Sequence, residues 1–431
     1  MEGLKNTIDK ICERILWAHL SKMKKGVLTI LMPGGRIVKF GSEKIINSQI
    51  EHEIFNKVVG YRADIKINDI RFFRNCILAG DIGFGESYEE NLWETPDLKA
   101  VISWFIDNAD QTHMVSHERK KRYLGFYNII SLYNKLIHRK NKNSLIGSKN
   151  NIQYHYDLNN EFFKLFLDPS MTYSSAYFNN FENNNLELAQ KNKIKKLCDS
   201  LQLCSSDTVL EIGSGWGSCA VYMAQQYGCK ILSITLSEQQ LQYAREKVKN
   251  LGLSHLIEFQ LKDFRNVEGT FDKIISIEMM EALGDKLLPV FFSKVNSLLK
   301  MNGIFSFQVI TCPDSRYDQF VEGVDWIQKY IFPGSLLLSV GRMVAVLNQV
   351  SNLQLFNLID LGKHYEKTLS IWKEQFESNL DEIKNIIPCE KFHRRWRYYL
   401  KYCEAAFATR NISVVQMTLT RPNNNLLSWP T

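Results

Sequence analysis

The sequence predicts an α/β fold, with a doubly wound sheet of parallel strands in its larger part and a small α+β unit before it. Three observations carry this prediction. β-rich and helical patterns alternate from about residue 150 onward, a glycine-rich turn follows one buried strand, and the first 110 residues combine a hairpin pattern with helical segments. A chain of 431 residues is long enough for two or three domains.

The amino-terminal unit is expected to span residues 1–110. Residues 1–22 have apolar side chains at helical spacing, and "GVLTILMPGGRIVKFG" places a Pro-Gly-Gly turn between two β-rich runs. "YRADIKI" predicts another strand, and "DIRFFRNCILAG" predicts a short helix that ends at Gly80.

Residues 111–150 are strongly basic and partly amphipathic. The segment from Glu118 to Lys149 contains nine Lys or Arg residues and one Glu, whereas the net charge of the whole chain is only +7. We interpret the segment as a basic amphipathic helix and a linker. On charge alone the patch suits nucleic acid or anionic lipid equally well, and a solvated connection or packing on a domain explains it as well.

The nine cysteines are scattered singly, without C-x-x-C spacing, so no metal site and no disulfide framework is indicated. This usage favours a reducing cytoplasm. Charged residues interrupt the start "MEGLKNTIDKICERILWAHL", which argues against a signal peptide, and no apolar run has the length of a membrane span. We therefore expect a cytoplasmic protein whose membrane contact, at the inner face of a membrane, is peripheral.

Residues 151–431 are expected to form the catalytic domain around the parallel sheet. The predicted helices are "GSCAVYMAQQYG", "SEQQLQYAREKVKNLG" and "PVFFSKVNSLLKM", and the predicted strands are "DTVLEIGS", "KILSITLS", "IEFQLKD", "FDKIISIE" and "GIFSFQVI". Ligands of such sheets bind beyond the carboxyl ends of the strands, where the glycine-rich turn lies.

The turn contains Gly213, Gly215 and Gly217 in the pattern G-x-G-x-G. It differs from the G-x-G-x-x-G of dinucleotide enzymes and lacks the Lys-Ser/Thr pair of a P-loop. The pattern favours a ligand without a pyrophosphate, such as S-adenosylmethionine, and a plain tight turn is the alternative. In "ITLSEQQ", Ser237 and Gln240 also form a capping box for the next helix. Asp263 in "KDF" suits an adenine amino group or a helix cap.

A set of longer segments resembles the cyclopropane-fatty-acyl-phospholipid synthase family. The segments are "HYDLNNEFFKLFLDPSMTYSSAYF", "VLEIGSGWG", "SITLSEQQ", "EMMEALG", "YIFPGSLLLS", "HYEKTLSIW" and "YYLKYCEAAF". They occur in the family's order and cover the catalytic half. "LTILMPGGRIVKFG" and "LAGDIGFGESYEENLWETPDL" resemble the amino-terminal substrate-recruiting domain of longer members.

The resemblance implies a class I methyltransferase fold and an enzyme that transfers a methylene from S-adenosylmethionine to the cis double bond of an unsaturated phospholipid acyl chain. An alkene is a weak nucleophile, and its attack on a sulfonium methyl leaves a carbocation. Aromatic faces stabilise such a cation, water must be excluded, and a base must remove a proton before the ring closes.

The resemblance also implies that a bicarbonate ion acts as this base. Glu281 would orient the ion, Tyr365 would donate a hydrogen bond to it, and Ser175 and Ile310 would offer backbone groups. Gln308 stands where many members have His, which replaces a group that can carry charge by a neutral one. By the same matching, the residues expected to contact the cofactor are Tyr173, Ser174, Gly213, Gly215, Gly217, Thr235, Gln240, Asp263 and Phe264.

Several positions depart from the family's pattern. Ser175 replaces a Cys, Ala282 replaces a His after Glu281, and Cys403 matches a cysteine that the family has sometimes assigned as active. A buried helix cysteine is the alternative for Cys403. Methyl or methylene branching without ring closure, N-methylation of a small amine and a non-catalytic lipid-binding homologue are the alternative functions. The expected partner is unsaturated phospholipid in an anionic membrane surface, without nucleic acid, and the family suggests a homodimer.

Overall fold

The computed structural model describes residues 2–42, 44–50, 53–59, 61–109, 159–425 and 427. Contacts divide the chain into two units. The first contains Met1–Ile137, Val324–Lys329 and Ile387–Asn411, and the second contains His138–Gly323, Tyr330–Ile386 and Ile412–Thr431. The predicted basic helix and linker at 111–150 lies outside the described residues, so its structure stays a prediction.

The amino-terminal part of the first unit is an α+β arrangement, as predicted. Its four-stranded sheet has the order β2-β1-β5-β6, and β1 and β2 form the expected antiparallel hairpin around the Pro-Gly-Gly turn. A separate hairpin, β3 with β4, was not predicted. The elements are α1 (Glu2–Leu20), β1 (Gly26–Leu31), β2 (Ile37–Ser42), β3 (Lys44–Ile50), β4 (Glu53–Val59), β5 (Arg62–Ile67), α2 (Arg71–Glu89), β6 (Trp93–Glu94) and α3 (Leu98–Asn108).

The helix expected to end at Gly80 breaks there, as predicted, and a second helical segment of α2 continues to Glu89. Gly80 has φ 58° and ψ −131°, which breaks the helix locally, as glycine permits. The chain then resumes helical geometry because Ile82 and Tyr88 are buried on the far side of the break. The glycine therefore makes a kink between two helical segments.

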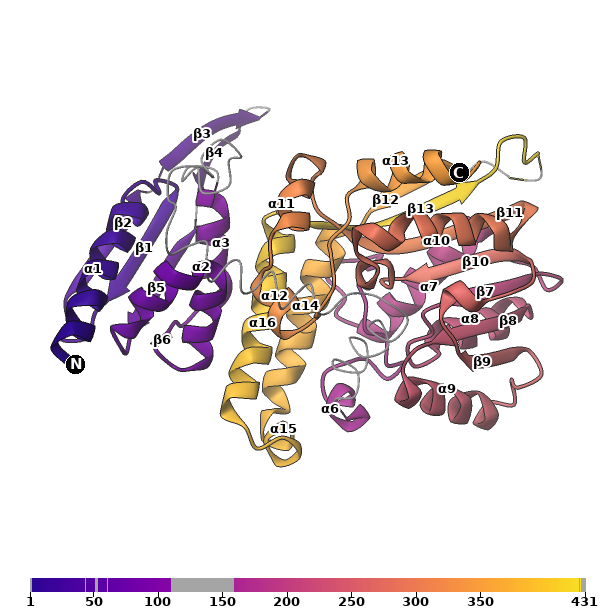
Figure 1. The fold of residues 1–431 in the computed structure, drawn as a ribbon, viewed down its shortest axis with the longest axis horizontal. Coiled ribbons are helices and arrows are strands. Elements are labelled where there is room, and N and C mark those ends of the chain that lie inside the picture. Colours follow the sequence, from indigo (N-terminus) through magenta and orange to yellow (C-terminus); the bar gives the residue numbers. More distant parts are fainter. Residues whose placement is uncertain are drawn as a thin grey trace. The chain divides into compact units, whose positions relative to one another are not determined.

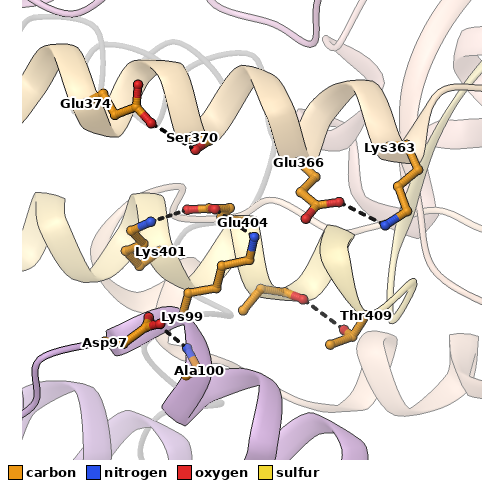
Figure 2. A network of polar contacts seen from close by, with 11 residues as sticks. Asp97, Lys99, Ala100, Lys363, Glu366, Ser370, Glu374, Lys401, Glu404 and Thr409 are labelled. Atoms are coloured by element: carbon orange, nitrogen blue, oxygen red, sulfur yellow. Dashed lines mark hydrogen bonds and ion pairs between the residues drawn. The ribbon is translucent and has the colours of Figure 1, made fainter. Parts of the chain in front are cut away.

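Helix α16 (Glu390–Ala408) belongs to the first unit, although the sequence analysis assigned its residues to the catalytic domain. It packs against α2 and α3. The buried carboxylate of Glu404 pairs with Lys99 of α3 at 2.8 Å and with Lys401 at 2.6 Å (Figure 2). In the same view, Asp97 accepts a hydrogen bond from the Ala100 backbone and so begins α3. These contacts are long-range, which is why local sequence patterns did not assign α16 to this unit.

The second unit contains the predicted doubly wound sheet, in the order β12-β13-β11-β10-β7-β8-β9 (Figure 1). The five predicted strands run parallel to one another, while β13 pairs antiparallel with β11 and with β12. The last two strands were not predicted. The strands are β7 (Thr208–Ile212), β8 (Lys230–Thr235), β9 (Ile257–Leu261), β10 (Phe271–Ile277), β11 (Leu299–Thr311), β12 (Gln354–Asp360) and β13 (Ser413–Thr420).

Helices cover both faces of this sheet because successive strand residues point to opposite faces. Val209 of β7 packs into one apolar cluster with residues of α7, α8 and α9. Its neighbour Leu210 packs into a second cluster with residues of α10 and α13. The helices of the second unit are α6 (Asn160–Lys164), α7 (Leu186–Leu201), α8 (Ser218–Tyr227), α9 (Glu238–Asn250), α10 (Gly284–Leu298), α11 (Tyr317–Glu322), α13 (Val340–Val350), α14 (Gly362–Ser378) and α15 (Leu380–Ile386), and α12 (Trp326–Tyr330) crosses the boundary between the units.

The described part of the chain contains no helix with the length and apolar character that a membrane crossing requires.

Candidate active site

The glycine-rich turn follows β7 and leads into α8. Its three glycines have positive φ, +97° at Gly213, +49° at Gly215 and +84° at Gly217, where L side chains are strained. A Cβ at Gly217 would lie 3.0 Å from Ala244 and Phe259 of the neighbouring elements. A Cβ at Gly215 would meet nothing within 4 Å. Gly217 therefore permits packing of the helix, while Gly215 leaves open space beside the backbone.

A cavity of about 160 Å³ opens at this turn. Seven of the nine residues predicted to contact a cofactor line it, and these are Tyr173, Ser174, Gly213, Gly215, Thr235, Gln240 and Phe264. The open space at Gly215, the absence of a phosphate-binding lysine in the turn and the polar groups at the end of β8 fit S-adenosylmethionine. Their individual contacts with it stay predictions.

Two residues of the neighbouring strand end are engaged with each other. Thr235 donates its hydroxyl hydrogen to the Gln240 side-chain oxygen at 3.0 Å. The Ser237 hydroxyl accepts from the Gln240 backbone N–H at 3.3 Å and begins α9, as the capping-box pattern predicted. Thr235 and Gln240 are thus held at the cavity wall.

Asp263 does not belong to the lining of this cavity. Its carboxylate accepts a hydrogen bond from the Arg265 backbone at 3.0 Å and pairs with the Arg265 guanidinium at 2.6 Å, at the start of a short 3₁₀ helix (Phe264–Asn266). Asp263 therefore caps this short helix, which is one of the two roles expected from the sequence. Its contact with adenine stays a prediction.

Beside the turn, the half-buried carboxylate of Glu278 accepts hydrogen bonds from three donors. One oxygen of Glu278 accepts from the Ser175 backbone N–H at 2.9 Å and from the Gln308 amide nitrogen at 2.7 Å. The other oxygen accepts from the Tyr365 hydroxyl at 2.9 Å. Glu278 follows the last residue of β10 and lines the cavity. Sequence reasoning did not select it.

The Gln308 amide is fixed on both sides. Its nitrogen also donates to the Ser175 carbonyl oxygen at 3.2 Å, and its oxygen accepts from the amide nitrogen of Gln416 on β13 at 3.0 Å. Gln308, which stands in place of His, is therefore a neutral hydrogen-bond donor to the Glu278 carboxylate. Ser175 contributes its backbone N–H, so the replacement of a Cys side chain does not affect this bond.

Glu281 lies one turn farther along, in a short 3₁₀ helix (Met280–Ala282). One carboxylate oxygen accepts from the Ile310 backbone N–H at 2.6 Å. The other oxygen is buried and has no hydrogen-bond partner in the described part of the chain. Burial and the nearby charge of Glu278 raise the pKa of Glu281 to about 8. Glu281 is therefore mainly protonated at neutral pH.

These contacts do not fit a bound bicarbonate ion. Three of the groups assigned to hold bicarbonate, from Ser175, Gln308 and Tyr365, donate to Glu278 instead, and Ile310 donates to Glu281. A bicarbonate ion would compete for these donors and would bring a negative charge beside the Glu278 carboxylate. Like charges at such short range in a buried site are strongly unfavourable.

Lys193 is a second residue that sequence reasoning missed. It lies on α7, is fully buried and lines the cavity. Its ammonium donates to the Ser174 hydroxyl at 2.5 Å. Burial lowers the pKa of Lys193 to about 8, and the Lys193 charge in turn opposes the rise that burial causes in the pKa of Glu278.

Aromatic rings form part of the surrounding wall. Tyr173 and Trp216 line the cavity, with Phe163 between them at ring-centroid distances of 5.5 Å and 5.1 Å. Tyr173 also packs on Trp372 at 5.2 Å, and Trp372 meets the ring of Tyr365 edge-on at 6.0 Å. The wall therefore extends from the cavity to the Glu278 cluster.

Cys403 lies on α16 in the first unit, whereas every other candidate residue lies in the second. Burial raises the pKa of its thiol well above the ordinary value, which disfavours a thiolate nucleophile. An active role for Cys403 stays a prediction without structural support.

Comparison with known proteins identifies the family of the chain. The family model described as "Mycolic acid cyclopropane synthetase" matches residues 143–417. The chain belongs to this family. The cyclopropane-fatty-acyl-phospholipid synthase of Escherichia coli is 33% identical, over 84% of this chain and 89% of its own length. "Tuberculostearic acid methyltransferase UfaA1" of Mycobacterium tuberculosis is 34% identical, over 79% of each chain.

Solved structures agree with this membership. The cyclopropane synthase MmaA2 from Mycobacterium tuberculosis has a TM-score of 0.59 and 28% identity, and covers 63% of this chain and 98% of its own. CmaA1, solved in complex with S-adenosylhomocysteine (SAH), gives the same values. The predicted family and fold class are confirmed: the chain is an enzyme of the methyltransferase class with the class I fold.

Proposed function

We propose that this family member transfers a one-carbon unit from S-adenosylmethionine to the cis double bond of an unsaturated phospholipid acyl chain and closes a cyclopropane ring. One observation carries the proposal: a half-buried carboxylate, Glu278, and an aromatic side chain, Tyr173, line the same cavity as the glycine-rich turn. This combination supports the proposal because it places a methyl-donor site and an aromatic face beside a carboxylate.

The methyl donor would lie against the turn at Gly213 and Gly215, with Thr235 and Gln240 at the end of β8 and Tyr173 and Phe264 also in the wall. When bound, S-adenosylmethionine supplies an electrophilic methyl group on a sulfonium sulfur. The other requirements fall to the residues of the chain.

Those residues would stabilise positive charge and exclude water. The faces of Tyr173 and Trp216 carry negative electrostatic potential, which stabilises a carbocation by about 1–2 kcal/mol per well-placed ring. The rings of Phe163 and Trp372 behind them are apolar and packed, so water has little access to the reacting carbon from that side.

Methyl or methylene branching without ring closure is a second candidate. It is favoured by similarity to a tuberculostearic acid methyltransferase and to a probable fatty acid methyltransferase of Pseudomonas putida, which is 34% identical over 63% of this chain. Both candidates begin with the same carbon–carbon bond and differ in how the resulting cation loses its charge.

The lipid partner is proposed to be phospholipid in an anionic membrane surface at the inner face of a membrane. Support comes from the nine Lys or Arg residues between Glu118 and Lys149, which lie outside the described residues. Binding of the purified protein to anionic vesicles should weaken as salt is raised. Salt-independent binding would contradict this part of the proposal. A homodimer stays a prediction.

The proposal is tested with methyl-labelled S-adenosylmethionine and vesicles of an unsaturated phospholipid. The fatty acids are released and identified by mass spectrometry. A cyclopropane product supports the first candidate, and a methyl- or methylene-branched product supports the second. Measurable binding of the methyl donor without label in any lipid would refute both.

A further inference from the structure

The hydrogen-bond donors around Glu278 form a complete carboxylate-binding site whose occupant is part of the chain. Two donors reach one oxygen and one donor reaches the other, at 2.7–2.9 Å from Gln308, Ser175 and Tyr365. A carboxylate with three donors on its two oxygens has the charge and planar shape of bicarbonate. We propose that Glu278 is the general base of the reaction and takes the place of a bound bicarbonate ion, an inference that rests on the proposed function.

The backbone at Glu278 supports this role. Glu278 has φ +48°, in the left-handed region that is unfavourable for a residue other than glycine. Its N–H donates to the Gln308 carbonyl oxygen at 2.8 Å, which fixes this conformation at the end of β10. The chain turns sharply here, and the carboxylate lies at the cavity wall beside Gly213 and Met279. Strain of this kind persists where the surrounding structure imposes it, commonly at functional sites.

The groups around Glu278 oppose the rise of its pKa, whereas Glu278 itself adds to the rise of the pKa of Glu281. Burial raises the pKa of Glu278, and the charge of Lys193 on α7, the Gln308 amide of β11 and the Tyr365 hydroxyl of α14 oppose that rise. Glu281 is another titratable neighbour, and Glu278 adds to the rise that burial causes in the pKa of Glu281. A pair of carboxyl groups whose pKa values are driven apart in this way can assign one group as the base.

The proton transfer balances without an additional reactant. After the new carbon–carbon bond has formed, a C–H bond of the added methyl group breaks and its proton goes to a Glu278 oxygen. The electron pair of that C–H bond forms the third carbon–carbon bond of the ring, which neutralises the cation. If a 1,2-hydride shift comes first, the same pair forms the double bond of a methylene branch. Glu278 ends as a carboxylic acid and loses its proton to solvent before the next turnover.

The first test needs no variant. Turnover of the wild-type protein on unsaturated phospholipid vesicles is measured in carbon-dioxide-free buffer with and without added bicarbonate. We expect the two rates to agree within about twofold, because the base belongs to the chain. A rate that falls on depletion and recovers with bicarbonate would overturn the inference. No lipid product under either condition would refute the proposed function and the inference together.

The second test uses Glu278→Gln, Glu278→Gly and, as a matched control, Glu258→Gln at an exposed position of β9. Glu278→Gln should lower turnover at least about 100-fold, while the control stays within about twofold of wild type. The dissociation constant for S-adenosylhomocysteine, measured by calorimetry, should change less than about threefold in each variant.

Glu278→Gly relieves the positive φ and empties the carboxylate position. Added bicarbonate or formate should then raise its rate at least about tenfold in a saturable manner, as expected for a replaced base. A Glu278→Gln variant that binds S-adenosylhomocysteine normally and keeps more than about a tenth of the wild-type rate would overturn the inference. Failure of both anions to rescue a folded Glu278→Gly variant would do the same.

Discussion

The Tyr365 hydroxyl donates to an oxygen of Glu278 at 2.9 Å, and this bond joins α14 to the end of β10. The two residues are 87 positions apart in the chain. The same tyrosine meets Trp372 edge-on, so the hydroxyl is held in place by packing as well as by the hydrogen bond. Tyr365 therefore links the aromatic wall to the carboxylate.

Removal of this hydroxyl should affect the charge of Glu278. In Tyr365→Phe, the lost hydrogen bond raises the pKa of Glu278, so the acidic limb of the pH–rate profile should move to higher pH. We expect turnover at neutral pH to fall by about tenfold, with a change in unfolding free energy of about 1 kcal/mol. Methyl transfer assays across pH 5–9 measure the shift of the profile and the fall in turnover, and urea unfolding measures the change in unfolding free energy. An unchanged profile would contradict the link between Tyr365 and the base.

Glutamine should replace Glu281 better than alanine does. Because Glu281 is mainly protonated at pH 7, Glu281→Gln keeps a neutral side chain with an oxygen for the Ile310 N–H, while Glu281→Ala removes it. We expect turnover within about threefold of wild type for the Gln variant and a loss of at least about tenfold for the Ala variant. Binding of S-adenosylhomocysteine should be nearly unchanged in both. Equal losses in the two variants would show that Glu281 acts as a carboxylate.

The raised pKa of Glu281 also predicts how stability changes with pH. The folded state holds this proton up to about pH 8, whereas an unfolded Glu releases it near its ordinary value of 4.5. Between these values the native state binds more protons than the unfolded state. The free energy of unfolding therefore falls as pH rises through this range. Wild type should lose on the order of 2–4 kcal/mol relative to Glu281→Gln between pH 5 and pH 8.5. Urea unfolding at the two pH values measures the difference.

Alanine variants of two glycines should distinguish a loss of ligand binding from the effect of backbone strain. A Cβ at Gly215 or at Gly252, which follows α9, would meet nothing within 4 Å, and φ is positive at both. Alanine should therefore cost each site about 1 kcal/mol of stability. Only Gly215 lines the cavity, so Gly215→Ala should weaken S-adenosylhomocysteine binding at least about tenfold. Comparable affinities in the two alanine variants would contradict the placement of the ligand at the turn.

The sequence predicted the part of the fold that local patterns determine. The five parallel strands, α8, α9 and the cap at Ser237 follow from alternation, glycine positions and side-chain chemistry within short windows. Strands β12 and β13 pair only with distant segments, and β12 is partly exposed without a regular alternation. The location of α16 in the first unit depends likewise on side chains about 300 residues away.

In the candidate site too, local motifs were predicted, whereas contacts between distant segments were not. The turn and the position of Glu281 were recognisable as motifs, but the partners of Glu278 come from three distant segments, at Ser175, Gln308 and Tyr365. A signal was nevertheless present in "IEMMEALG", where a second glutamate follows a buried strand directly. Lys193 was hidden in the lysine-rich "KNKIKK", although it continues the buried stripe of α7 formed by Leu186, Ala189, Gln190, Ile194 and Leu197.

The buried charge of Lys193 should lower the stability of the folded protein and at the same time raise its activity. The pKa of Lys193 falls from its ordinary 10.5 to about 8, so below pH 8 the folded protein holds a buried charge that the unfolded chain would solvate. The unfolded state binds more protons between these values, which means that wild-type stability should rise with pH from about 8 to 10.5. Lys193→Met has similar volume and no charge, and should be more stable than wild type by about 1–2 kcal/mol at pH 7.

The same substitution removes the positive charge that lowers the pKa of Glu278. The acidic limb of the pH–rate profile of Lys193→Met should therefore move to higher pH, and turnover at pH 7 should fall by at least about tenfold. Thermal unfolding and methyl transfer are measured on the same preparation, with Lys195→Met, an exposed position on the same helix, as the control. A Lys193→Met protein that keeps wild-type turnover and its pH profile would show that the buried ammonium does not tune the base.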